Sequence, residues 1–459
     1  MEQQEFDALV SDPEKLIKAI QDTKKTDNSE DYAKQYDPKQ HEVMDTAKRQ
    51  DKVVETDKGA SVVPVARLPI AFQKHIVGLA AAFLCGNPVT LDAQPVDQAE
   101  TDFLKVLRRH WADNKLDYDG KTIAKIMMSE TEAAEIWYTE QVDPMYWRGT
   151  VYEGAVPFRL RMKIIAKKYG DSLYPVTNAA GDMIAFGRGY SVAISGKNEE
   201  HFDVYTEKAK YLFVKGESGW SVTTETNAAG KIPVIYYSQD KPEWHDVQEL
   251  IDRAEAFLSN HADTNDYNGS PLLFVEGEIE GFAKKGERGR VLQGKAGAKL
   301  NYVSWQQSIE SLKFEWNTLR GLIFDLTGTP DISIEQMKSL GTYSGTALKM
   351  LFLGAHLKAA DKEETFGKSV QRRINYMKHV LGLWNQKYLE ASMMTIAPKF
   401  EYYLPKNYQE IIEMLNTATG GKPTMSKKTA ISLNPFVTDP EKELDLVESE
   451  GLDTEQNSL

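Results

Sequence analysis

Few residues of this chain have the types and the spacing that enzyme chemistry requires. Gly120-Lys121-Thr122 imitates the end of a phosphate-binding loop, but that loop needs a glycine five positions before its Gly-Lys pair, where this sequence has Lys115. The eight histidines are scattered without the helical spacing of a zinc pair, and one cysteine, Cys85, cannot form a cysteine zinc cluster. No Gly-x-Ser-x-Gly nucleophile elbow occurs, and no pair of carboxylates stands out. The sequence therefore predicts no catalytic residue, no cofactor and no metal site.

Positive charge gathers in a glycine-rich stretch that contains Lys284, Lys285, Arg288 and Arg290. Such a cluster is either a solvated loop or a surface that docks a partner or contacts DNA. The whole chain has a net charge of −13. This charge argues against a broad grip on nucleic acid, because tight phosphate contact needs clustered Lys and Arg. It is compatible with a channel whose carboxylates repel a DNA backbone that must slide past.

The composition is that of a soluble globular protein of two or three domains, with 459 residues, 41% of them hydrophobic and 27% charged. No stretch approaches the roughly 18 consecutive apolar residues of a membrane-spanning helix. The acidic, polar start is not that of a signal peptide. Phe83 and Leu84 beside Cys85 favour a buried core thiol over a reactive one, and we expect a reducing cytoplasm as the compartment of synthesis.

The first half of the chain is expected to change from helices to strands. Asp12 and Pro13 predict the start of a short helix that runs to Ile20, and the rest of residues 1–60 is expected to form a partly mobile arm. The further expectations are a buried helix that ends at Gly86-Asn87-Pro88, helices over 100–112 and 120–131, a strand over 133–141, and an antiparallel meander within 156–237 that begins with a strand over 160–169.

The second half contains the most regular pattern of the sequence. Apolar residues step by four and three along a helix predicted over 304–326, which would be about 35 Å long and end at Gly328-Thr329-Pro330. The seam consists of Ile309, Leu312, Trp316, Leu319 and Ile323, with Trp305 and Leu326 at its ends. It fits either a core-facing helix or a bundle or ring of helices. The neighbouring segments are an amphipathic helix over 246–261, a short strand over 272–275, a polar loop over 331–345 and a long helix from about 346 towards 388.

The order of several short motifs resembles the phage portal protein family. The motifs are the Arg-x-Pro-Ile helix entry at 67–70, Gly86-Asn87-Pro88, the β meander, Ile232-Pro233-Val234-Ile235, Leu250-Ile251-Asp252-Arg253-Ala254-Glu255, the Phe-Asp-Leu-Thr-Gly-Thr-Pro-Asp segment at 324–331, Ser344-Gly345-Thr346-Ala347-Leu348-Lys349, Leu404-Pro405, Ser426-Lys427-Lys428-Thr429 and Asp439-Pro440-Glu441-Lys442-Glu443-Leu444. They cover roughly residues 61–450 in the family's order. The stretch over 267–303 is unusually rich in Gly and Lys, and residues 1–60 match no part of the pattern.

The resemblance implies an α+β, mainly α, portal fold. Its parts would be an N-terminal arm at 1–60, a wing of helices and a β meander at 61–240, a first stem helix at 241–266, a clip at 267–303, a second stem helix at 304–330, a tunnel loop at 331–345, a long wing spine helix at 346–395, and a helical crown with an acidic tail at 396–459.

The resemblance also implies a dodecameric ring around a channel at one capsid vertex of a tailed phage. Double-stranded DNA would pass through it, without sequence reading, during packaging, retention and ejection. The expected partners are the terminase large subunit, which would supply the energy for packaging, a head-completion or adaptor protein, and the major capsid and scaffolding proteins, with no membrane. The ring would be assembled in the host cytoplasm and would end in the virion. The alternatives are another ring-forming head–tail connector, or a capsid-associated nuclease or protease.

Three sets of residues are the candidate sites. The tunnel loop offers Glu335, Gln336, Lys338, Ser339 and Thr342 to the DNA channel, and Lys338 would form a circle of positive charge if it points to the axis rather than into solvent. The basic cluster Lys284, Lys285, Arg288 and Arg290 is the candidate docking surface of the clip. The seam Ile309, Leu312, Trp316, Leu319 and Ile323 is the candidate packing surface between subunits.

Overall fold

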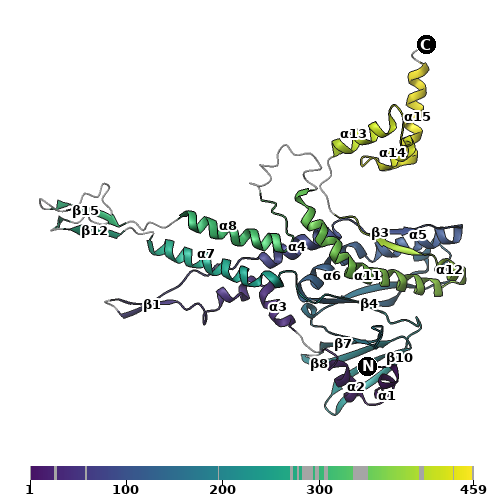
Figure 1. Cartoon of the computed structure of the whole chain (residues 1–459). Coiled ribbons are helices and arrows are strands. Elements are labelled where there is room, and N and C mark those ends of the chain that lie inside the picture. The colour runs from purple at the N-terminus through teal and green to yellow at the C-terminus, as the bar shows by residue number, and fades with distance from the viewer. Residues whose placement is uncertain are drawn as a thin grey trace.

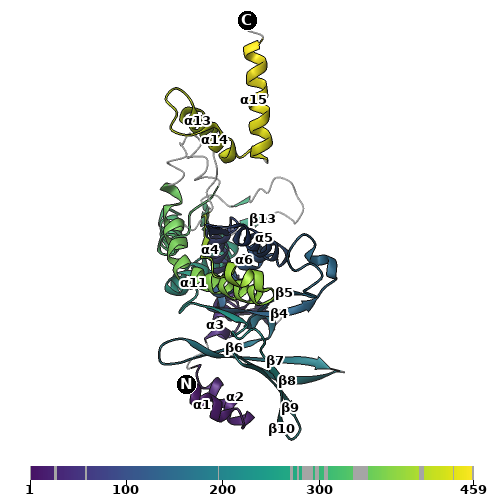
Figure 2. The same cartoon turned by 90° about the vertical axis from the view of Figure 1, so that its right-hand side faces the viewer.

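The computed structural model describes residues 2–24, 28–56, 59–194, 196–268, 272–276, 279–281, 293–294, 299–303, 309–333, 350–402, 408–437 and 439–456. Helices and antiparallel sheets combine in these residues, which confirms the expected α+β class. The chain forms a body of helices and sheets, a pair of long helices that projects from it, and a group of C-terminal helices that stands apart (Figures 1 and 2).

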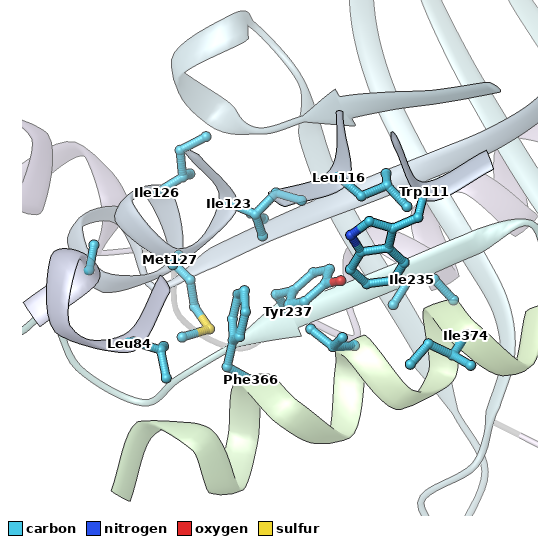
Figure 3. Close-up of a cluster of buried hydrophobic side chains, with 14 of the residues drawn as sticks. Leu84, Trp111, Leu116, Ile123, Ile126, Met127, Ile235, Tyr237, Phe366 and Ile374 are labelled. Carbon is cyan, nitrogen blue, oxygen red and sulfur yellow. The ribbon is translucent and has the colours of Figure 1, made fainter. Parts of the chain in front are cut away.

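The helical part of the body contains the largest apolar core of the described chain. Its helices are α4 (Phe72–Cys85), α5 (Gln98–Asp113), α6 (Leu116–Glu130), α11 (Leu353–Leu383) and α12 (Gln386–Ala391). Phe366 and Ile374 of α11 reach Tyr237 and Ile235 of the adjacent strand, and Met127 of α6 closes the cluster (Figure 3). The helix expected to continue towards residue 388 stops at Leu383, and Asn385 caps α12 by accepting a hydrogen bond from the Lys387 N–H.

A three-stranded antiparallel sheet lies against these helices in the order β11-β4-β5. The strands are β4 (Glu132–Gln141), β5 (Phe158–Ile165) and β11 (Val234–Ser238). The expected meander is therefore split, because β4 takes both β5 and β11 as partners. The first strand of the expected meander also ends four residues early. Asp171 accepts a hydrogen bond from the Ala166 N–H, and Gly170 turns the chain with a φ of 87°.

The remaining strands form a five-stranded meander in the order β10-β9-β8-β7-β6. They are β6 (Ser172–Thr177), β7 (Met183–Ile194), β8 (Lys197–Thr206), β9 (Ala209–Gly216) and β10 (Gly219–Thr226). Side chains alternate between its faces. Phe202 and Val204 of β8 share a core with N-terminal helices, whereas Tyr205 shares one with Ile136 of the three-stranded sheet.

The N-terminal segment forms more structure than the expected arm. It contains α1 (Gln3–Leu9), α2 (Pro13–Gln21) and α3 (Ser29–Tyr36), and Asp12 caps α2 as predicted. Phe6, Leu16 and Ile20 are buried against the five-stranded sheet. Their burial stabilises the segment through apolar contacts. The mostly polar composition of residues 1–60 gave no indication of these contacts.

The projecting part consists of two long helices and the strands that follow and precede them (Figure 1). Helix α7 (Gln248–Asn268) leads away from the body, and α8 (Ile309–Leu326) leads back. Between them lie β12 (Leu272–Glu276), β13 (Ile279–Gly281), β14 (Gln293–Gly294) and β15 (Lys299–Val303), with β12 paired to β15 and β13 to β14. A separate hairpin of β1 (Lys52–Thr56) and β2 (Gly59–Val63) extends beside α7.

The C-terminal group contains α13 (Tyr408–Thr419), α14 (Lys427–Leu433) and α15 (Pro440–Gln456). Before it, β16 (Ile396–Lys399) pairs with β3 (Thr90–Ala93) and joins the end of the chain to the helical core. Of the helices in the described ranges, none combines the length and the apolar character needed to cross a membrane.

Candidate functional site

The α7–α8 pair is the element that carries the predicted packing seam. The two helices lie side by side, and Arg253 of α7 donates from Nε to Glu315 of α8 over 3.0 Å. Both charged side chains are partly exposed, so the pair contributes little stability and mainly fixes how the helices are aligned.

The seam on α8 is divided between the subunit's own core and solvent. Leu319 and Ile323 are buried within the chain, and the Trp316 ring lies 6.5 Å from the ring of Phe72 on α4. In contrast, Ile309 is 60% exposed at the start of the helix. The structure therefore joins the second half of the predicted seam to the body and leaves its first residue available to a partner.

A segment of the N-terminal region clasps α7. The buried carboxylate of Glu255 lies 2.6 Å from Nδ1 of the buried His41, and it accepts a hydrogen bond of 2.7 Å from the Ile70 N–H. The other ring nitrogen of His41 lies 2.7 Å from the Gln35 carbonyl oxygen. Burial alone would lower the pKa of His41, but its hydrogen bond to Glu255 and the charge of that carboxylate raise this pKa above its usual value.

Farther along α7, charged and polar groups continue this clasp, the set of contacts that residues 35–70 make with α7. Arg49 contacts Asp263 over 2.6 Å, and the Ala66 N–H donates to the other oxygen of Asp263 over 2.6 Å. Ser259 accepts a hydrogen bond of 2.9 Å from the Leu68 N–H. Residues on both sides of the β1–β2 hairpin are thus fixed to one face of α7.

The end of α8 and the start of α11, on either side of the predicted tunnel loop in sequence, lie in contact. Gly328, after α8, has a φ of 60°, and an added Cβ there would lie 3.2 Å from the Gly354 carbonyl oxygen on α11. This position favours glycine for both reasons. Asp331 accepts from Arg320 over 2.7 Å and from the Ser333 N–H over 3.0 Å. The chain therefore leaves α8 and enters α11 at adjacent points.

A buried glutamate strengthens this junction. Glu243 contacts Lys358 over 2.7 Å and Lys362 over 2.9 Å, and Lys358 also donates to the Thr327 carbonyl oxygen over 2.8 Å. Burial alone would raise the pKa of Glu243, but the two ammonium groups lower it below the ordinary value. The carboxylate is thus held in its charged form and links α11 to the segment that precedes α7.

Two of the three candidate sets lie outside the described residues. The tunnel-loop residues Glu335, Gln336, Lys338, Ser339 and Thr342 fall within 334–349, and the clip residues Lys284, Lys285, Arg288 and Arg290 fall within 282–292. Both sets stay predictions. Only the strands around the clip set and the helix ends around the loop are placed.

Elsewhere in the described chain, the side chains whose types could take part in chemistry lie within helices or in the core. Gly120-Lys121-Thr122 lies inside α6 and therefore does not form a loop before a helix, which is the geometry of a phosphate-binding loop. Burial raises the pKa of the Cys85 thiol to about 12 and lowers that of His110 to about 4. Over the described ranges, no three His, Cys, Asp or Glu side chains gather as a metal site would require.

The clasp and the Glu243 network were not predicted from the sequence. His41 and Glu255, like Arg49 and Asp263, are separated by more than 200 positions, and no local pattern connects them. No local signal marked Glu255 as buried, because Ala254, Phe257 and Leu258 keep the spacing of the apolar stripe around it.

The comparisons with known proteins identify one family. The model of the family described as "Phage portal protein, SPP1 Gp6-like" matches residues 14–457. A search of curated proteins found no match. Among solved structures, a chain from "Neck of empty GTA particle computed with C6 symmetry" is similar at 15% sequence identity and a TM-score of 0.36, covering 78% of this chain and 88% of that one. On the family match over nearly its whole length, this chain belongs to the SPP1 Gp6-like family of phage portal proteins.

Proposed function

We propose that twelve copies of this chain form the ring at one capsid vertex of a tailed phage through which double-stranded DNA is packaged, retained and ejected. The observation that carries the proposal is the family match over residues 14–457. The ring is a structural conduit, and the force for packaging comes from the terminase large subunit.

The geometry supports this proposal at two places. The α7–α8 pair extends from the body and offers apolar side chains beyond its own core, as a subunit of a closed ring must offer a face to its neighbour (Figure 1). The end of α8 and the start of α11, which flank segment 334–349 in sequence, lie in contact at Gly328 and Gly354, so the segment between them would return to the same part of the body in every copy. Twelve such loops around an axis would surround DNA symmetrically.

The same proposal assigns the partners. The strands between α7 and α8 carry the clip with Lys284, Lys285, Arg288 and Arg290, which would dock the terminase during packaging and a head-completion or adaptor protein afterwards. Contacts with the major capsid and scaffolding proteins would seat the ring in the capsid. Assembly would take place in the host cytoplasm, and the final location is the virion.

The experiment replaces Lys338 with Glu in phage particles. In the proposed channel, Lys338 forms a circle of positive charge that touches phosphates without reading sequence. Its reversal should leave rings assembled but reduce the amount of full-length genome packaged or retained. Packaged DNA is measured after nuclease treatment of purified particles.

The matched control is Lys105→Glu, which reverses an exposed lysine on α5 outside the loop. This variant should package like the wild type. If Lys338→Glu particles package and retain a full genome as well, Lys338 does not contact the passing DNA.

A further inference from the structure

The β1–β2 hairpin projects from the side of α7 as a two-stranded ribbon (Figure 1). Its register pairs Lys52 with Val63 and Val53 with Val62, and the strands end at Thr56 and Gly59. Residues 52–55 and 59–63 are all exposed. Among the residues that the structure describes, no third strand pairs with the hairpin and no helix covers it. A two-stranded ribbon of this kind is marginally stable in water, so the hairpin needs a surface to pack on.

Four valines make the hairpin unusually apolar for an exposed element. Val53 and Val62 are 67% and 64% exposed, and Val54 and Val63 are 44% exposed each. Because directly paired residues of an antiparallel ribbon point to the same side, Val53 and Val62 form one apolar pair. The neighbouring Ser61 points to the other side of the ribbon.

The base of the hairpin is fixed while its valines are exposed. Before β1, Arg49 binds Asn260 over 2.8 Å and Asp263 over 2.6 Å, both on α7. After β2, the Ala66 N–H donates to Asp263, and Arg67 closes the base by contacting Asp51 over 2.8 Å. The orientation of the ribbon relative to α7 is therefore fixed, as binding to a partner at a defined place would require.

The first half of α8 also presents exposed apolar side chains. Ile309 is 60% exposed and Phe314 is 73% exposed, in the half of α8 nearest the end of α7 that holds the hairpin. Figure 1 shows α7 between α8 and the hairpin, so the two exposed apolar surfaces lie on different elements of one chain. A ring with more than two subunits around one axis needs two such different faces, because its contacts are heterologous.

We propose that the β1–β2 hairpin is a latch between copies of this chain, with Val53 and Val62 packed on the first half of α8 of the adjacent subunit, at the exposed side chain of Ile309 or of Phe314. This inference rests on the proposed ring. The proposal makes residues 52–63, for which the sequence suggested no role, one half of the interface between subunits. The first half of α8 is the other half of that interface. Each subunit gives a hairpin to one neighbour and receives one from the other.

Cross-linking between subunits tests the latch. Val62→Cys is combined with Ile309→Cys, or with Phe314→Cys, and assembled protein is treated with a short bismaleimide. The wild type, whose single cysteine is the half-buried Cys85, controls for any cross-link that this thiol makes. At least one pair should give a ladder of covalent dimers, trimers and larger species on a denaturing gel.

The matched control introduces the cysteine at Ser61 instead of Val62. The side chain of Ser61 lies one position from Val62 and points to the opposite side of the ribbon. It should give at least tenfold less cross-linked product. Ring images of the uncross-linked samples separate the two proposals. Rings without a ladder, or with equal ladders from Ser61→Cys and Val62→Cys, overturn the latch alone, whereas a wild type that stays monomeric overturns the ring and the latch together.

A second variant tests the same contact without cysteine. Val53→Lys with Val62→Lys should raise the protein concentration needed for assembly at least tenfold, while the melting temperature of the isolated subunit stays unchanged because both side chains are exposed there. Val53→Thr with Val62→Thr keeps the shape and the strand preference and should have a smaller effect. Assembly of the lysine variant at wild-type concentration would contradict the latch.

Discussion

Arg373 connects the long helix α11 to strand β4 from inside the core. Its guanidinium contacts the Glu135 carboxylate over 2.7 Å, and both side chains are fully buried. The same guanidinium lies 5.5 Å from the ring centre of Trp111. Burial alone would lower the pKa of Arg373, but the charge of Glu135 raises it, so the guanidinium is held in its charged form.

Removing one member of this pair should be costly. Arg373→Met leaves the Glu135 carboxylate buried without its counter-charge, which should lower the free energy of unfolding by about 3–5 kcal/mol. Urea denaturation of the subunit measures this loss. The double variant Arg373→Met with Glu135→Gln should recover most of it, and equal losses in the single and double variants would contradict a role for the charge.

The His41–Glu255 contact makes the clasp on α7 dependent on pH. Because the pKa of His41 is raised in the folded chain, its stabilisation is fully present below the unfolded value of about 6.5 and is lost as the pH rises through the higher folded value. The wild type should therefore lose stability relative to His41→Gln as the pH rises from about 6 to 9. Each unit of pKa difference contributes about 1.4 kcal/mol.

Thermal unfolding of both proteins across that pH range provides the measurement. Subtracting the two curves removes the contributions of the titrating groups that they share. A difference that stays constant with pH, or that grows as the pH rises, would show that His41 is not charged in the clasp.

At the scale of the element, the proposed ring would give α8 two kinds of contact, within the subunit along its second half and with a neighbouring subunit along its first half. Ile309→Asp places a carboxylate at an exposed position, so it should weaken assembly and leave the melting of the isolated subunit unchanged. Trp316→Asp should lower both, since Trp316 packs on Phe72 within the chain. Light scattering after size exclusion and thermal unfolding distinguish the two effects.

The opposite pattern would reassign the seam. If Ile309→Asp assembles at wild-type concentration, the first half of α8 is not at an interface between subunits. If Trp316→Asp loses assembly but melts like the wild type, its contact with a neighbour matters more than its contact with α4.

Local signals explain which elements could be predicted. Asp12 before Pro13 and Gly86 after the apolar run define helix ends by capping and by chain termination, and the structure places α2 and α4 there. The partners of β4 were not predictable in this way. Ile136 pairs with Lys163 on one side and Val234 on the other, and pairing over such separations depends on the whole fold.

At the scale of the whole molecule, the sequence predicted the projecting pair but not what fixes it to the body. The heptad spacing indicated α8, and the 3.6-residue period indicated α7. Their attachment depends on Glu255, Asp263 and Glu243, whose partners are distant in sequence. From the sequence alone, a charged side chain is expected to be exposed to solvent. Its burial and its pairing with an opposite charge become visible only in the folded structure.

The central claim is that this chain forms a closed ring whose loops 334–349 surround a channel. Cryo-electron microscopy of the purified full-length protein tests it most directly. The account predicts closed rings of twelve subunits with a central hole, with Lys338 nearest the axis and the α7–α8 pairs of neighbouring subunits side by side. Monomers or open filaments at assembly concentrations, or rings with loop 334–349 on the outer rim, would contradict it.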